Sequence, residues 1–376
     1  MVQSLKNFPT KKEKEFNPDN YSLRVQRPVF KSDKKGMIGI ELEMEGTGLL
    51  RRLLTVVNGI GWAVHNEGSL RNGGLEYVLT EPCKIGDEGP LLAGIYREMT
   101  DAGTRLNLSS RCSTHVHINA AGLKINQLAS VVILWAVLED VLVNWCGEKR
   151  AGNLFCLRFS DCDTAAVRWS DAFKRGRFDF PEQYRYLALN GNALSKFGSL
   201  EFRTLRGADN PDLVLKWIEC LLRLRELGEG RFRNPNNIAT EFSGLGPIGF
   251  LEDVLKGLKI LPEIFTANEK VGANINDLLW EGLRRAQPMI FALPWHEVIE
   301  EADKTYIPDP FNEPAKKIAD IERIRMRGAR PVRMGDGWAP IHLEPVLDGM
   351  GAEGADDLDP IDDEADDPEE EDEDGN

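Results

Sequence analysis

The segment 36–46, GMIGIELEMEG, carries a carboxylate at every second position, because Glu41, Glu43 and Glu45 alternate with apolar residues. Successive side chains of a β-strand point to opposite faces, so the three carboxylates would share one face at a spacing of roughly 6.5 to 7 Å. Like charges at this distance raise one another's pKa unless a positive charge lies between them. The pattern is typical either of a solvated strand face or of a divalent-cation site.

Three further segments place titratable side chains on one face of a predicted strand or hairpin arm. They are the strands STHVHIN (113–119) and GSLEFRTLRG (198–207), and the hairpin HNEGSLRNGGLEYVLTEP (65–82). Each motif by itself is typical of an ordinary strand pair or of a cross-strand ion pair. Four such strands in one sheet would gather the titratable groups into a site. These groups are His115, His117, Glu201, Arg203 and Glu76.

Clustered carboxylates need a cation or an arginine near them. Oxygen ligands suit Mg²⁺ or Mn²⁺, and the planar fork of an arginine binds phosphate. Carboxylates, divalent ions and arginine together are what phosphoryl transfer from a nucleotide requires. The alternative chemistry is that of a zinc-dependent hydrolase, in which His115, His117 and a carboxylate would hold the metal. A zinc hydrolase would not require the additional acids and the arginine on the same face.

The motifs GIELEME, EGSLRNGGLEYVLTEP, STHVHIN and RYLALNGNALSKFGSLEFRTLRG occur in an order that resembles the amidoligase family of carboxylate-amine ligases. This family is distantly related to glutamine synthetase and to glutamate-cysteine ligase. The resemblance covers roughly residues 36–225. It implies an α+β fold of the glutamine synthetase kind, with a curved antiparallel sheet, helices packed on one of its faces and the active site on the concave face.

The resemblance also implies a reaction and its cofactors, ATP and Mg²⁺ or Mn²⁺. A substrate carboxylate would attack the terminal phosphate of ATP, and an amine would displace the phosphate from the resulting acyl phosphate to form an amide. The substrates would be a carboxylate and an amine carried by an amino acid, a peptide or a protein side chain. The chain would be cytoplasmic and would come from bacteria or their viruses.

Residue by residue, the resemblance implies metal ligands, phosphate contacts and two further catalytic groups. The metal ligands would be Glu41, Glu43, Glu76 and Glu201. Arg203 would clamp phosphate, and His115 and His117 would contact metal or nucleotide phosphate. Arg185 would meet phosphate or the substrate carboxylate. Glu67 stands where the family pattern has an aspartate and would reach a metal or the incoming amine, while Glu45 is left as solvated or outside the ligand set.

The elements that position these residues follow from periodicity. Alternation with glycine-rich turns predicts strands and hairpins from 36 to about 120. Helices are predicted over 122–146, 211–227 and 274–286, the second with Asn210 as its N-cap. The apolar run within 122–146 contains Glu139 and Asp140, so it is predicted as a core helix rather than a membrane span.

Composition adds an organisation of four parts. Residues 1–35 are a polar arm, 36–290 the catalytic domain, 291–349 an extension rich in proline and arginine, and 350–376 an acidic tail expected to be disordered. Of 61 Asp and Glu residues, 15 lie in that tail, which leaves 46 acids against 46 Lys and Arg residues. This neutral body argues against direct nucleic-acid binding.

The remaining expectations concern partners and cysteines. The acidic tail suits a basic partner, and the arms and tail together leave open a non-catalytic scaffold for assembly. We expect no association with membranes. The six cysteines contain no CxxC pair and are expected to be reduced thiols.

Overall fold

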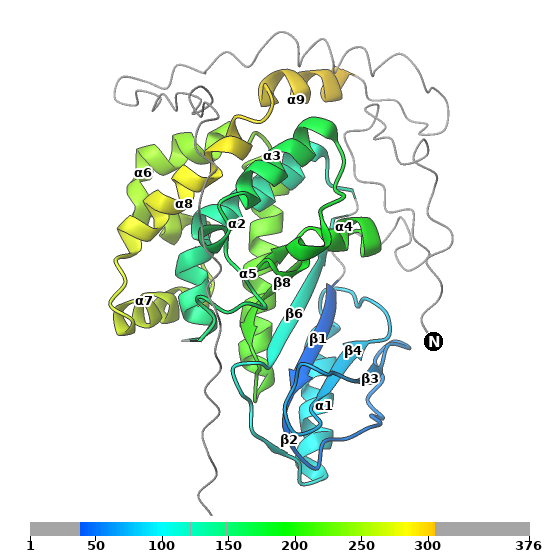
Figure 1. Ribbon diagram of the computed structural model, residues 1–376. Helices are drawn as coiled ribbons and strands as arrows, with labels where there is room; N and C mark the ends of the chain where they lie inside the picture. The colour runs from blue at the N-terminus through cyan, green and yellow to red at the C-terminus, as the bar shows by residue number, and fades with distance from the viewer. Residues whose placement is uncertain (1–37, 121, 148, 305–376) are drawn as a thin grey trace, which may run out of the picture. The chain divides into compact units, whose positions relative to one another are not determined.

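The computed structural model describes residues 38–120, 122–147 and 149–304 (Figure 1). The predictions for the N-terminal arm and the acidic tail, and for the extension beyond residue 304, lie outside these residues. The folded part continues past residue 290, where the sequence predicts the catalytic domain to end. Trp295 is fully buried, and its ring lies 6.1 Å from that of Phe173.

The centre of the fold is a six-stranded antiparallel sheet with the strand order β3-β4-β1-β6-β8-β7. A separate two-stranded sheet joins β2 to β5. The predicted strands and the hairpin are confirmed, and only their ends differ. The strands are β1 Ile38–Met44, β2 Gly46–Thr47, β3 Trp62–Asn66, β4 Leu75–Leu79, β5 Arg105–Leu106, β6 Ser113–Asn119, β7 Leu189–Asn190 and β8 Ser199–Arg206.

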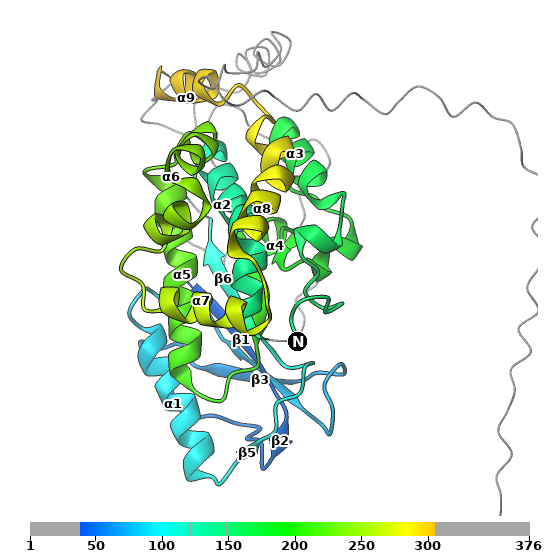
Figure 2. The same ribbon diagram turned by 90° about the vertical axis from the view of Figure 1, so that its left-hand side faces the viewer.

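Most of the helices lie together, whereas α1 lies lower in the view, at the level of β2 and β3 (Figure 2). The helices predicted from periodicity correspond to α2, α5 and α8, and Asn210 caps α5 by accepting a hydrogen bond from the Leu213 N–H. The α-helices are α1 Glu88–Asp101, α2 Ile125–Cys146, α3 Ala165–Arg175, α4 Asn192–Phe197, α5 Pro211–Glu229, α6 Asn236–Val254, α7 Ile260–Lys270, α8 Ile275–Ile290 and α9 Trp295–Lys304.

The expectation of strands and hairpins throughout 36–120 was wrong for α1. Its buried residues Leu91, Leu92, Ile95 and Met99 recur at helical spacing, and this local period outweighs the alternation on either side. In both views α1 lies beside α5, behind the sheet as Figure 1 shows it.

Strand alternation separates the two faces of the sheet. The apolar residues of β1, β6 and β8 are buried under the helices, and the ring of Trp135 on α2 lies 5.0 Å from that of Phe202 on β8. The opposite face carries the titratable residues and is called the site face below. The sheet is open, with β3 and β7 at its edges. The α+β class and the antiparallel sheet are confirmed, whereas the likeness to glutamine synthetase stays a prediction.

Helix α2 is long and apolar enough to cross a membrane, but 94% of its apolar window is buried inside the protein. The prediction of a core helix is therefore confirmed. Its two acids are also buried. Glu139 accepts hydrogen bonds from Trp135 Nε1 (2.9 Å) and from the Phe159 N–H, while Asp140 pairs with Arg158 (2.9 Å) and Arg285.

A β-bulge interrupts β8 where it pairs with β6. Val116 pairs with Phe202 and Thr114 with Leu205, so His115 alone faces both Arg203 and Thr204. The extra residue keeps Leu205 in the core, although it is out of phase with Phe202 along the strand.

Candidate active site

The register of the sheet brings the predicted residues of four strands onto the site face. Glu43 on β1 pairs with Glu76 on β4, and Glu41 on β1 pairs with His115 on β6. His117 pairs in turn with Glu201 on β8. Because directly paired residues point to the same side of a sheet, these six side chains form one continuous row of acids and imidazoles.

Glu41 lies at the centre of this row. Its Oε2 atom is 3.0 Å from Nδ1 of His115, and its Oε1 atom is 3.1 Å from Nε2 of His117. Burial by itself would raise the pKa of Glu41, but the hydrogen bonds from the two histidines outweigh it and hold that pKa well below its usual range. Burial opposes the charge of His117, yet the hydrogen bond to Glu41 and the charge of Glu201 raise its pKa. Glu41 is therefore ionised in the folded protein.

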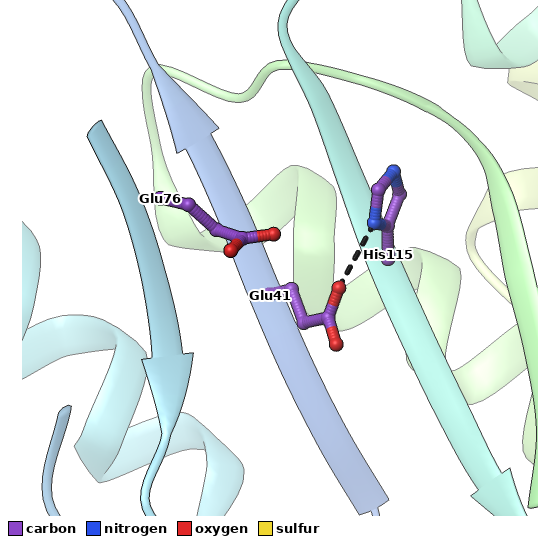
Figure 3. Close-up of side chains that lie close together, drawn as sticks. All are labelled: Glu41, Glu76 and His115. Carbon is purple, nitrogen blue, oxygen red and sulfur yellow. Dashed lines mark hydrogen bonds and ion pairs between the residues drawn. The ribbon is translucent and has the colours of Figure 1, made fainter. Parts of the chain in front are cut away.

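Glu76 is the acid with the opposite behaviour. Burial, followed by the charges of Glu41, Glu43 and Glu67, raises the pKa of Glu76 to about 8. Figure 3 shows its carboxyl group on the same side of the sheet as Glu41 and His115, directed toward them. At neutral pH Glu76 is thus protonated unless a cation offsets the neighbouring negative charges.

The other two carboxylates of the row are held by neutral donors and by an arginine. Glu43 is 8% exposed and accepts hydrogen bonds from the N–H (2.9 Å) and the hydroxyl of Ser113. Glu201 is 5% exposed and accepts one from Asn190 Nδ2 (2.7 Å) and one from Nη1 of Arg203. The Arg203 guanidinium therefore lies at the edge of the acid row, beside Glu201.

Part of the chain matches a known protein family. Residues 74–222 match the family model described as "Putative amidoligase enzyme". This segment belongs to the amidoligase family. No curated protein matches the chain.

The amidoligase segment contains β4, β6, β7 and β8, and hence most of the site residues. Strand β1 and the acids Glu41 and Glu43 precede it. The register nevertheless inserts β1 between β4 and β6, so these two acids lie in the middle of the face that the segment forms.

Two overlapping groups of side chains could hold a metal ion. Glu41, Glu76 and His115 form one group (Figure 3), and Glu41, His117 and Glu201 form the other. The ligand atoms of each group lie within 4.8 Å of one another. Two carboxylates and an imidazole suit Mn²⁺, and the carboxylates with water suit Mg²⁺. Burial and the neighbouring carboxylates raise the pKa of Glu76, and a divalent cation held by the first group would offset both effects.

The arrangement does not favour the zinc alternative. His115 and His117 fall into different ligand groups among the described residues. A catalytic zinc set with two histidines would need both rings to converge on one point.

The remaining predicted residues are Glu67 and Arg185. Glu67 is half-buried in the loop after β3, where its Oε1 accepts a hydrogen bond from the Ser69 N–H, and its charge reaches Glu76. Arg185 is exposed, and its hydrogen bonds go to Glu182 (3.0 Å) and to the hydroxyl of Tyr186. These contacts do not join it to the acid row, so its role stays a prediction.

Glu45 is neither solvated nor part of the row. It is 3% exposed, lies just beyond the end of β1, and its Oε1 accepts a hydrogen bond from the Arg71 N–H. The sequence interpretation also missed Ser113 and Asn190, whose contacts with Glu43 and Glu201 depend on the strand register. Asn190 lies in the quoted motif LALN, where the alternation continues into the edge strand.

Proposed function

We propose that this chain is an ATP-dependent carboxylate-amine ligase whose site face binds nucleotide phosphates through two divalent cations. The observation that carries the proposal is the position of Glu41 in both candidate ligand groups, one of which includes Glu201, the partner of Arg203. Two cation positions that share a carboxylate next to an arginine suit the phosphates of a nucleotide. The amidoligase match of residues 74–222 supports the same reaction class.

In this proposal Glu41, Glu76 and His115 hold one ion, and Glu41, His117 and Glu201 hold the other. Mg²⁺ or Mn²⁺ would supply charge neutralisation at the phosphates. Glu43 lines the same face and would add negative charge beside the first ion. Arg203 can turn one Nη group to a phosphate oxygen while the other stays with Glu201, because the guanidinium fork has donors on both sides.

The reaction would proceed in two displacements. A carboxylate oxygen of the acid substrate attacks the γ-phosphorus of ATP, and ADP leaves with the electrons of the broken P–O bond. The amine nitrogen then attacks the carbonyl carbon, and inorganic phosphate leaves. We assign Glu67 to accept the proton that the amine loses, because it borders the row without belonging to either ligand group.

Thermal unfolding with and without Mg²⁺ and ATP tests the nucleotide site. A ligand at 100 times its dissociation constant stabilises the folded state by about 2.7 kcal/mol, and Glu41→Gln and Arg203→Ala should each remove the effect. A stabilisation that needs both metal and nucleotide would then justify a screen of acids and amines for phosphate release. No stabilisation at millimolar ATP would refute the proposal, and stoichiometric zinc in the purified protein would revive the hydrolase alternative.

A further inference from the structure

Arg150 is a buried arginine without a carboxylate partner among the described residues. It follows α2, in the loop that leads from Gly147 to Leu157, and it is 2% exposed. Its Nε atom donates to the carbonyl of Thr204 (2.8 Å), and its Nη2 atom donates to the carbonyl of Arg203 (2.7 Å). The Nη1 atom lies 3.5 Å from the carbonyl oxygen of Ser110. Burying a charged guanidinium costs free energy, and no carboxylate in the described part of the chain offsets that cost here. The burial of Arg150 against backbone carbonyls therefore calls for a specific structural explanation.

The reason lies in the β8 bulge. Arg203 and Thr204 are the two residues that face His115 together, and a bulge leaves the backbone groups of its extra residue without ladder partners. The two carbonyls that Arg150 binds belong to these same two residues. The guanidinium fork thus replaces the hydrogen bonds that the strand lacks at the bulge.

The same loop also holds the side chain of Arg203. The carbonyl of Phe155 accepts from Nε of Arg203 (3.4 Å), and the Arg203 N–H donates to the carbonyl of Ala188 (2.9 Å). The Arg203 side chain is therefore fixed at Nε by the loop and at Nη1 by Glu201. Arg150 in turn binds the backbone carbonyl of Arg203.

We infer that Arg150 is a positioning residue, which locks the β8 bulge so that the Arg203 guanidinium faces the phosphate-binding end of the site. The inference rests on the proposed function in one respect only, the role of Arg203 toward phosphate. The contact between Arg150 and the bulge does not depend on that role. Bulges beside active sites commonly re-aim a side chain, and here a buried arginine would hold the bulge in place.

Hydrogen exchange tests the lock without any ligand. We would compare the wild type with Arg150→Lys and Arg150→Gln by mass spectrometry of the peptide that contains 199–206. Neither replacement can span two carbonyls from the required distance, so exchange in this peptide should accelerate at least tenfold while β1 is unaffected. Arg225→Lys is the matched control, because Arg225 is also buried and donates to a strand carbonyl, that of Asn119 (3.0 Å), away from the bulge. Unchanged exchange in a folded Arg150 variant would overturn the inference.

A double-mutant cycle tests the consequence for the site. We would measure the dissociation constant of Mg·ATP for Arg150→Lys, Arg203→Lys and the double variant. If Arg150 acts through Arg203, Arg150→Lys weakens binding about tenfold, and the double variant is no weaker than Arg203→Lys. Additive losses would assign Arg150 a general stabilising role and overturn the inference. If the wild type binds no Mg·ATP, the proposed function fails, and the exchange experiment still decides whether Arg150 holds the bulge.

Discussion

The first prediction is that metal binding expels a proton from Glu76. Burial and the neighbouring carboxylates raise its pKa to about 8, so about nine tenths of the metal-free molecules carry this proton at pH 7. A carboxylate must lose its proton before it can bind a cation. Binding at pH 7 should therefore release about 0.9 proton per ion held by Glu41, Glu76 and His115.

The same pKa sets the pH dependence of metal affinity. Each pH unit below about 8 adds about 1.4 kcal/mol to the cost of removing the proton, so affinity should fall about tenfold per unit from pH 8 to pH 6. Above pH 9 the affinity should level off, because Glu76 is then ionised before the metal arrives. In Glu76→Gln no proton is available at this position, and the pH dependence due to Glu76 should disappear.

Isothermal titration with Mn²⁺ in two buffers of different ionisation enthalpy measures this proton release directly. The matched control is Glu139→Gln, because the pKa of Glu139 is also raised to about 8 by burial and by the charge of Asp140, but Glu139 lies in the core rather than in the ligand groups. Glu139→Gln should release as many protons as the wild type. Metal binding without proton release at pH 7 in the wild type would refute the electrostatic argument for Glu76.

Three further predictions concern other groups. Glu41→Gln should remove both cation positions, whereas Glu201→Gln should remove only one. Electron paramagnetic resonance would measure the number of Mn²⁺ ions bound by each variant. Loss of the same number of ions in both variants would contradict a Glu41 shared by the two positions. Glu139 has a folded-state pKa above its unfolded value, so its contribution to stability is present at low pH and is lost as pH rises from about 4.5 to 8. In urea titrations over this range, Glu139→Gln should therefore reduce the decrease of the unfolding free energy with pH by up to about 1.4 kcal/mol per pH unit. The same dependence of unfolding free energy on pH in the variant and the wild type would contradict this prediction. Arg185→Ala should lower kcat/KM for ATP about tenfold without changing the stability of the metal-free protein, and full activity would remove Arg185 from the site.

The strands and their faces could be predicted from the sequence because their alternation is strict. In the segments of β1 and β6, each carboxylate or imidazole of the row has at least one apolar neighbour along the strand. The pairing between strands could not be predicted in the same way. That Glu41 faces His115, and His117 faces Glu201, depends on the register, which forms only when the sheet does.

The bulge and its support were also missed, for two different reasons. Leu205 is out of phase with Leu200 and Phe202, and this break in alternation is a signal of a bulge that can be found in the sequence. Arg150 gives no such signal, since it follows a helix in an irregular loop. Its role depends on the carbonyls of residues more than fifty positions later in the chain.

The buried acids of α2 have a consequence for the biosynthesis of the chain. As it leaves the ribosome, 125–146 presents 22 mostly apolar residues, long enough to be taken for a membrane anchor by the insertion machinery. Each acid near the middle of such a segment opposes insertion by about 2.5 to 3.5 kcal/mol, less toward its end. In the folded protein the same acids are satisfied by Trp135, Arg158 and Arg285. Glu139 and Asp140 thus oppose membrane insertion of this segment during synthesis. The free-energy cost of burying them in the core is offset once the surrounding helices have assembled.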